Sequence, residues 1–414
     1  MKGRSIALLM VLIVAAGGMA FAQKTTVQFM TPLSGADGGY MDQIIQGFNK
    51  ANPDIEVQHV VVGNSVEYKQ KLSTGLTTDS APQVLLIRKF DLAMYLDQVL
   101  PFTAADFKGY GIDIGDIYPN LLEGLTTKDK KYLGFPIDVW IFYQAYNKGN
   151  FKKAGLDPNK PPMTRAEFEK AMLALKKVTP EGITPYYEDL TWSWCWVNFF
   201  WQMGGDLLTP DFKKPAFQKA GVAACNLLLD WQAKGIVPTA KVDAGPVFQG
   251  GQSSFICTGI WTINPWAEAL KGDFGYAVAP QVGTTKAVFG GSHVIALPAS
   301  MNKDPKVKAA SMKWVKYLWD HMIDWYAAGQ TPSRKSIATS AELKAKLPMI
   351  YAVAQQLQYV KSFQMFPYIS ECLDAIATNL EDILMTHKLT PQAGMDKAAV
   401  EVQRILDDYW ATQK

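Results

Sequence analysis

The sequence has little of what metal and redox sites are built from, since its 414 residues include four histidines and four cysteines. The histidines are His59, His293, His321 and His387. None has a second histidine three or four residues away, the spacing that a helical metal site favours. The cysteines, at positions 195, 225, 257 and 372, form no CxxC pair. We therefore predict no metal and no cofactor. The cysteines allow three disulfide pairings, and buried free thiols are the simpler interpretation.

An excess of one charge is also absent. Lys and Arg total 41 and Asp and Glu total 38, which gives a formal net charge of +3 without any basic run. This balance argues against a nucleic-acid partner and against a polybasic membrane contact. With 48% hydrophobic and 19% charged residues the chain is globular, and its length suggests two or three domains of about 100–200 residues each.

Long apolar runs are confined to the N-terminus. Lys2 and Arg4 precede an apolar run from Ile6 to Ala16, and Ala20-Phe21-Ala22 offers a small-x-small cleavage site. This pattern predicts a signal peptide over residues 1–22, because the run is too short to span a bilayer. No cysteine follows for lipid attachment. We expect a soluble mature protein that is exported to the periplasm and released there.

Motifs of common enzymes are missing as well. The sequence contains no G-x-G-x-x-G, no Walker lysine loop, no G-x-S-x-G elbow and no H-E-x-x-H. No pair of acidic residues stands out for the general-acid and nucleophile roles of a glycosidase. We therefore predict that the protein is not an enzyme.

Alternating strand and helix patterns are what the first part of the chain does contain. Short β runs at 27–30, 55–62 and 83–87 are separated by helix patterns, the first with four apolar residues on one face. Those residues are Met41, Ile44, Ile45 and Phe48. Strand, helix, strand, helix, strand predicts an α/β protein with an open parallel sheet.

Further elements follow in the middle and C-terminal parts. Residues 140–146 have the pattern of a buried strand, and Thr164 to Glu167 form a capping box that opens a helix. Asp304-Pro305 and Thr390-Pro391 each predict a helix start with proline at the first helical position. The segment 192–201 holds four tryptophans and is too aromatic for an ordinary loop.

Several segments in order resemble the extracellular sugar-binding proteins of ABC importers, in the maltose-binding-like solute-binding family 1. The matching stretches are KYLGFPID (131–138), AYNK (145–148), FKKAGL (151–156), PMTRAEF (162–168), FQGGQSSF (248–255), GIW (259–261), GGSHVIALP (290–298) and TPSR (331–334). Each stretch alone is unspecific, whereas the ordered set covers nearly the whole mature chain.

The resemblance implies a periplasmic binding protein fold of type II, in which two Rossmann-like α/β lobes are joined by a hinge of several crossings. We expect crossings near Pro136, Pro280 and Gln330. Lobe 1 would then comprise residues 23–135 and 280–329, and lobe 2 residues 136–279 and 330–414. A solute would lie in the cleft between the lobes, which close around it by hinge motion. The closed form would be presented to the membrane permease subunits of the importer.

A sugar offers apolar ring faces and a girdle of hydroxyl groups, so its site needs flat aromatic rings and planar polar groups. Trp261 stands at the family position where an aromatic ring commonly stacks on the ligand. Trp192 and Trp194 alternate with other residues, as side chains on one strand face do, and are predicted to line the cleft. On a helix, the residues from Trp194 to Trp201 would instead form a core stripe, which is the interpretation we favour for the later ones.

Polar candidates lie after two of the predicted strands. Ser34, Gly35 and Asp37 follow the first strand, and ligands of open α/β sheets bind at such strand ends. Their alternative role is that of a plain turn. Arg88 follows the third strand at the same expected edge. Gln83 stands where family members often have an aspartate, so the sequence departs from the family pattern there.

Polar residues near the crossings complete the predicted site. Asp138 would bridge hydroxyl groups across the closed cleft or, alternatively, stabilise the hinge by a hydrogen bond. Ser292 and His293 lie on the late strand that offers polar contacts in the family, although a lone histidine is often structural. Gln330 and Arg334 flank the third crossing, and Arg334 would otherwise cap a helix or pair with a carboxylate between the lobes.

These features together predict a monomeric periplasmic protein that captures a mono- or oligosaccharide without turnover and passes it to an ABC permease. Two alternatives stay open. One is a secreted carbohydrate-active hydrolase with two carboxylates in an aromatic cleft. The other is a related binder of a non-sugar solute, such as ferric iron or a polyamine.

Overall fold

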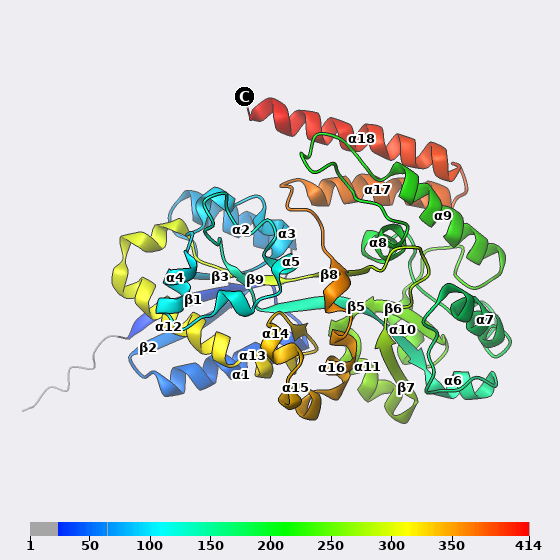
Figure 1. Cartoon of the computed structure of the whole chain (residues 1–414), viewed down its shortest axis with the longest axis horizontal. Coiled ribbons are helices and arrows are strands. Elements are labelled where there is room, and N and C mark those ends of the chain that lie inside the picture. Colours follow the sequence, from blue (N-terminus) through cyan, green and yellow to red (C-terminus); the bar gives the residue numbers. More distant parts are fainter. Residues whose placement is uncertain (1–23, 64, 414) are drawn as a thin grey trace, which may run out of the picture.

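The computed structural model describes residues 24–63 and 65–413, so the predicted signal peptide, residues 1–22, lies outside the described part. Within that part, no helix combines the length and the apolar character needed to cross a membrane. Figure 1 shows an elongated molecule with one sheet in each half, helices packed around both, and strand β5 near the middle.

The sheet of the first half has the order β2-β1-β3-β9-β4. Its strands are β1 (Thr25–Thr31), β2 (Ile55–Val61), β3 (Val84–Arg88), β4 (Phe135–Pro136) and β9 (His293–Ala296). The first three are parallel, as the sequence predicts, whereas β9 runs antiparallel to β3 and β4. The α/β prediction is confirmed, and the sheet is mixed because β9 and β4 come from distant parts of the chain. Helix α1 (Ala36–Ala51) buries the four predicted apolar residues against this sheet.

The sheet of the second half is built around β5 (Asp138–Asn147), whose ten residues are all buried. Strands β6 (Phe255–Gly259), β7 (Phe274–Val278), β8 (Val288–Gly291) and β10 (Thr331–Pro332) pair with it, and β11 (Val360–Lys361) pairs with β8. Because β5 has neighbours along its whole length, an apolar run without alternation is the expected sequence pattern.

The chain passes between the two sheets at three places. It leaves the first sheet between Pro136 and Asp138, returns at Ser292 between β8 and β9, and leaves again before β10 at Thr331. The predicted crossing near Pro280 is therefore wrong, since β7 and β8 on either side of it both pair with β5. Between the second and third passages, α12 (Pro305–Asp320) packs against β1, and α13 (Met322–Tyr326) packs against α1.

The predicted helix starts are confirmed. The Thr164 hydroxyl accepts from the backbone N–H of Glu167, whose carboxylate accepts from the N–H of Thr164, so α7 (Arg165–Leu175) begins with a capping box. Asp304 caps α12, and Thr390 caps α18 (Pro391–Thr412), each with proline at the first helical position. Local sequence thus determines where these helices begin.

The remaining helices are short around the hinge and longer at the outer end of the second half. They are α2 (Ser65–Thr77), α3 (Lys89–Leu92), α4 (Ala104–Gly109), α5 (Pro119–Leu122), α6 (Lys148–Lys153), α8 (Ser193–Gln202), α9 (Gln218–Ala233), α10 (Ala244–Gln249), α11 (Ile263–Leu270), α14 (Lys335–Ala338), α15 (Ala341–Lys346), α16 (Pro348–Ala354) and α17 (Ile369–Leu384). Helices α9, α17 and α18 pack together above β5 in Figure 1. All four cysteines are buried free thiols, as predicted.

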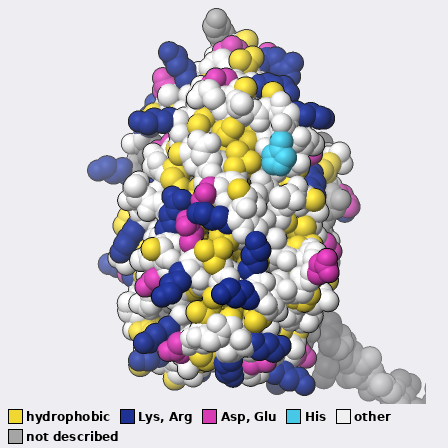
Figure 2. All heavy atoms as spheres, turned by 90° about the vertical axis from the view of Figure 1, so that its right-hand side faces the viewer, with side chains coloured by type: hydrophobic (Ala, Val, Ile, Leu, Met, Phe, Trp, Pro, Cys, Tyr) yellow, Lys and Arg dark blue, Asp and Glu magenta, His cyan; other side chains and the backbone are white. Residues whose placement is uncertain are grey.

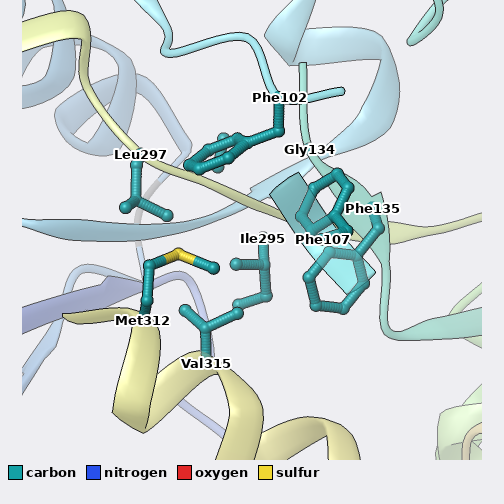
Figure 3. Close-up of a pocket in the computed structure, with 9 residues that line it drawn as sticks. Phe102, Phe107, Gly134, Phe135, Ile295, Leu297, Met312 and Val315 are labelled. Atoms are coloured by element: carbon teal, nitrogen blue, oxygen red, sulfur yellow. The ribbon is translucent and has the colours of Figure 1, made fainter. Parts of the chain in front are cut away.

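The core of the first half contains a small apolar cavity, shown in Figure 3. Phe102, Phe107 and Met312 line it, beside Gly134. Gly134 has φ +147°, and a Cβ there would lie 2.3 Å from the carbonyl oxygen of Ile295, so only glycine fits. The cavity measures about 10 Å³ and has room for no more than one water molecule. It is a packing gap and not a solute site.

Figure 2 shows the end of the molecule opposite the first sheet. On this face, Lys and Arg side chains are spread among acidic and apolar ones and do not gather in one patch.

Candidate functional site

A cavity of about 400 Å³ lies between the loop after β1 and the start of α11. Ser34, Gly35 and Asp37 line one side, and Trp261 and Asn264 line the other. The structure thus brings the predicted first-strand loop and the predicted stacking tryptophan to the same cavity. The loop lies at the C-terminal end of a parallel strand, where open α/β sheets bind their ligands.

Trp261 is held in place by a close approach to the backbone. A Cβ at Gly259 would lie 2.0 Å from the indole ring, so this ring requires glycine two residues before it. The ring meets Phe142, Trp140 and Trp194 edge-on, at centroid distances of 6.0, 6.1 and 6.3 Å. One part of the indole remains exposed to the cavity, and the rest is fixed by packing.

Trp192 and Trp194 join the same aromatic group, but not as neighbours on a strand. Trp192 is the N-cap of α8 and Trp194 lies in its first turn, so the strand interpretation is wrong. Their rings stack at 5.7 Å, and Trp194 stacks in turn on Trp140 at 5.0 Å with an interplanar angle of 11°. The later tryptophans of the segment, Trp196 and Trp201, are buried in the core, as the helical stripe predicts.

Trp140 packs behind the site, against Trp194 and Trp261, and was not predicted from the sequence to lie there. It lies on β5 and is 2% exposed, and its indole N–H has no hydrogen-bond partner within the described residues. Its position within a continuous apolar run gave no sign of a role beyond the core. The available signal was its spacing from Asp138, since residues two apart on a strand face the same side.

Arg88 lies at a smaller cavity of about 180 Å³, which Asp37 and His293 also line. The Arg88 side chain donates from Nε to Asp91 at 2.6 Å, and Lys69 contacts the same carboxylate at 3.1 Å. The Arg88 guanidinium also lies 5.1 Å from the ring centroid of Phe90. The cationic charge at this cavity is therefore already compensated by a carboxylate.

Asp138 is fully buried and its carboxylate is occupied by protein donors. It accepts from the backbone N–H of His293 at 2.8 Å, from His293 Nδ1 at 2.7 Å and from Trp325 Nε1 at 2.9 Å. These bonds join β5, β9 and α13 at the hinge, which favours the hinge-stabilising role over the bridge to hydroxyl groups. Because a carboxylate only accepts, His293 Nδ1 carries a proton in this contact.

Three further predicted residues, Ser292, Gln330 and Arg334, are not among the described residues that line the 400 Å³ cavity or the 180 Å³ cavity. Ser292 and Gln330 are 0% and 1% exposed. Arg334 donates to Asp116 at 2.8 Å and lies 4.2 Å over the Trp319 ring, so it has the alternative role of pairing with a carboxylate. Although burial opposes it, hydrogen bonds from Ser336 and Arg334 lower the pKa of Asp116.

Metal chemistry finds no support in the described part of the chain, where no three His, Cys, Asp or Glu side chains lie close enough together to hold an ion. What the site offers instead is the indole ring of Trp261 together with hydroxyl, carboxylate and imidazole groups. Such an arrangement binds a polar molecule that also has an apolar face.

The chain is similar to curated periplasmic proteins over different lengths. It is 24% identical to the sn-glycerol-3-phosphate-binding periplasmic protein UgpB of Yersinia pestis bv. Antiqua, over 95% of this chain and 94% of that protein. It is 35% identical to the protein of the same name from Salmonella typhimurium, over 172 residues. That match spans 40% of this chain and 38% of the relative's length.

Solved structures share the fold at low identity. The sugar-binding protein MalE of Xanthomonas citri matches with a TM-score of 0.81 and 21% identity, over 94% of this chain and 100% of that one. UgpB of Mycobacterium tuberculosis in complex with glycerophosphocholine matches with a TM-score of 0.78 and 21% identity, over 93% and 99%. The predicted binding-protein fold is thereby confirmed. The family model of the bacterial extracellular solute-binding proteins matches residues 43–349, and the chain belongs to this family of binding proteins, which are not enzymes.

Proposed function

We propose that the protein captures a neutral sugar between its two halves and delivers it intact to the permease of an ABC importer. The observation that carries this proposal is that Trp261, packed edge-on against Trp140 and Trp194, lines one cavity together with Ser34, Gly35 and Asp37. Indole rings cover the apolar faces of a sugar ring, and the loop and His293 supply hydrogen-bonding groups for its hydroxyls.

A neutral ligand fits the charges better than a phosphate ester does. The relatives named UgpB are described as binding sn-glycerol-3-phosphate. A phosphate is bound by arginine or lysine side chains that are free to form charge-assisted hydrogen bonds. Here Arg88 is already paired with Asp91, and the 400 Å³ cavity is lined by two acids, Asp37 and Glu268. These acids would repel a phosphate, whereas they accept readily from hydroxyl groups.

Two lobes that close by a hinge would follow from the strand arrangement. We infer lobe 1 from residues 24–136 and 292–329, and lobe 2 from residues 137–291 and 330–413. This division corrects the predicted boundary at residue 280. The bonds of Asp138 to His293 and Trp325 lie where the strands pass between the sheets, as a hinge requires. A periplasmic monomer released from its signal peptide, which docks onto permease subunits when closed, completes the proposal.

Isothermal titration calorimetry with a panel of sugars and with sn-glycerol-3-phosphate, followed by product analysis, tests the proposal. Binding of a sugar without breakdown supports it. Sugar cleavage would instead support the hydrolase, and binding of glycerol phosphate alone would overturn the neutral ligand.

A substitution of Trp261 tests whether this residue belongs to the sugar site. We expect Trp261→Ala to weaken sugar binding at least tenfold, about 1.4 kcal/mol, because it removes the stacking surface. Tyr110→Ala is the matched control, since this exposed aromatic residue lines neither cavity of the candidate site. Equal losses in both variants would remove Trp261 from the site.

A further inference from the structure

A series of three hydrogen bonds links helix α1 to the end of strand β1. In this series, Asp42 Oδ1 lies 2.6 Å from Nδ1 of His59, and Nε2 of His59 lies 2.7 Å from the hydroxyl oxygen of Thr31. That oxygen accepts from the backbone N–H of Leu33 at 3.3 Å. Asp42 belongs to α1 and His59 to β2, and Thr31 is the last residue of β1 (Figure 1). None of these four residues was predicted to belong to the site.

The chemistry of the groups sets the direction of these bonds. A carboxylate only accepts, so His59 Nδ1 carries a proton in its contact with Asp42. In the neutral imidazole Nε2 is then an acceptor, and the Thr31 hydroxyl donates to it. The oxygen of this hydroxyl still has lone pairs for the N–H of Leu33. Each donor therefore meets one acceptor, from the backbone amide to the carboxylate.

Carboxylate, imidazole and hydroxyl in this order also form the catalytic triad, in which the imidazole takes the proton of a nucleophile. Here the hydroxyl is closed off from any substrate. Thr31 is 0% exposed, and its oxygen already accepts from Leu33. Neither Thr31 nor His59 is among the described residues that line the 400 Å³ cavity or the 180 Å³ cavity. The arrangement therefore fixes the backbone and does not activate a nucleophile.

The amide at the end of the series belongs to the loop that lines both cavities. Pro32 lines both of them, Leu33 lines the 180 Å³ cavity, and Ser34 lines the 400 Å³ cavity. Ser34 also packs so closely on Gly63 that a Cβ there would lie 2.4 Å from its Oγ. Because the loop is short and closely packed, the position of the Leu33 amide determines where the following residues lie.

Phe29 and Asp42 orient the imidazole of His59. The Phe29 ring stacks on it, with centroids 5.9 Å apart and an interplanar angle of 19°. The His59 side chain is 8% exposed, whereas the Asp42 side chain is 52% exposed. Water screens so exposed a carboxylate, so Asp42 serves mainly to keep the proton on Nδ1. The buried bond between His59 and Thr31 is therefore the one on which the loop depends.

We propose that His59 is a positioning residue for ligand binding, which acts through Thr31 to hold the Leu33 amide and with it the Ser34–Asp37 wall of the 400 Å³ cavity. A wall that is fixed before binding saves the entropy of ordering it. The inference rests on the proposed function, because it takes this wall to contact the sugar. It adds to that function two residues that do not touch the sugar themselves.

Two substitutions of Thr31 separate the hydroxyl group from the shape of the side chain. Thr31→Val keeps the shape and removes the hydroxyl, whereas Thr31→Ser keeps the hydroxyl and removes a buried methyl group. Calorimetry with glucose, galactose, ribose and maltose identifies the probe, which is the one of these sugars that binds the unaltered protein most tightly. We expect Thr31→Val to weaken its binding about fivefold, because the sugar must then order the loop. Thr31→Ser should bind within about twofold of the unaltered protein, although it is less stable.

A double-mutant cycle tests whether His59 and Thr31 act through one bond. We expect His59→Leu to weaken binding by about the same factor as Thr31→Val, and the double variant to weaken it no further. His59→Gln keeps an acceptor near the position of Nε2 and should recover part of the affinity.

Asn49→Ala is the matched control, because Asn49 also links α1 to β2. Its side chain accepts from the backbone N–H of Val57 at 2.8 Å and donates to the carbonyl oxygen of Val57 at 3.0 Å. This link does not lead to the loop. The variant should therefore lose stability in thermal melting without losing affinity for the sugar.

Nuclear magnetic resonance gives a readout that needs no sugar. In protein labelled with ¹⁵N at histidine, the His59 signals are assigned by their loss in His59→Leu. We expect a protonated Nδ1 and an unprotonated Nε2 in the neutral ring. In protein labelled along the backbone, the Leu33 amide signal should shift in His59→Leu and in Thr31→Val, but not in Asn49→Ala.

Each result bears on a distinct claim. Unchanged affinity in Thr31→Val and His59→Leu, or a proton on Nε2 of the neutral ring, would overturn the positioning role and leave the sugar-binding function intact. An equal loss of affinity in Asn49→Ala would also overturn it, since any weakened contact between α1 and β2 would then have the same effect. Failure of every sugar to bind the unaltered protein would overturn the proposed function itself, and with it the role of His59 in binding.

Discussion

Two consecutive residues after β3, Arg88 and Lys89, differ in how their positive charges are compensated. Arg88 and Lys69 share the carboxylate of Asp91, at 2.6 and 3.1 Å. The one acceptor described for the ammonium group of Lys89 is the carbonyl oxygen of Asn120, at 3.5 Å, and burial lowers the pKa of Lys89 to about 8. Arg88 lines the 180 Å³ cavity, whereas Lys89 lines another cavity, of about 570 Å³. One short segment therefore presents a paired cation to one cavity and a poorly compensated cation to another.

The largest effect should come from a buried acid for which the described part of the chain shows no ion pair. Glu188 has an unpartnered carboxylate oxygen within the described residues, and burial raises its pKa to about 8. The folded state then holds a proton that the unfolded state releases above its pKa of about 4.5. The free energy of unfolding should fall from pH 5 to pH 8, by at most about 5 kcal/mol. Urea unfolding of Glu188→Gln should show a flatter pH profile and greater stability at pH 8.

A different pH dependence would contradict the assignment of this effect to Glu188. If the unaltered protein and Glu188→Gln lost stability in parallel between pH 5 and pH 8, the carboxyl group would not be the group that titrates.

Lys89 should make the stability change with pH in the opposite direction, and at higher pH. Since the pKa of Lys89 is about 8 when folded and 10.5 when unfolded, the folded state binds fewer protons between these values. Stability should therefore rise as the pH goes from 8 to 10.5, by at most about 3 kcal/mol. Lys89→Met should remove this rise and be the more stable protein at pH 7. A rise that persists in the variant would show that Lys89 is not buried as described.

Removing the carboxylate of Asp91 should lower the free energy of unfolding by a smaller amount. Asp91→Asn leaves Arg88 and Lys69 without their shared carboxylate, but both side chains are 26% exposed, so water takes over part of the solvation. We expect a loss of about 2 kcal/mol in unfolding free energy. The variant should also gain affinity for inorganic phosphate, which calorimetry measures. Asn120→Asp, at the cavity that Lys89 lines, is the control that should not show this gain.

Most of the fold could be predicted from the hydrophobic periodicity and the capping residues. Thr164, Asp304 and Thr390 each begin a helix because their side chains satisfy N–H groups of the first turn, which is a local effect. The second crossing was predicted at the wrong place, between β7 and β8. The sequence of a strand such as β8 does not indicate whether it pairs in the first sheet or in the second, and both β7 and β8 pair with β5. Strand partners depend on distant residues that a local pattern does not contain.

The candidate site was recovered in part. Ser34, Gly35, Asp37 and Trp261 line a cavity between the two halves, whereas Arg88 and His293 line a smaller cavity of the first half, and contact of these residues with a ligand stays a prediction. The packing of Trp140 behind Trp261 could not be predicted, because a strand that is buried on both faces gives a tryptophan no distinguishing neighbour. The burial of Lys89 could not be predicted either, because a lysine that follows a strand ordinarily points to solvent, and the cavity it lines is completed by residues 206–212 and 360–365 far along the chain.

The stack of Trp192, Trp194 and Trp140 has a spectroscopic consequence. Indoles that lie parallel at 5.0–5.7 Å couple their electronic transitions, and this coupling is sensitive to small changes in spacing and tilt. Trp194 also touches Phe90 from the first half, so a relative movement of the halves disturbs the coupled set. The near-ultraviolet circular dichroism of the unlabelled protein should therefore change when the two halves move relative to each other.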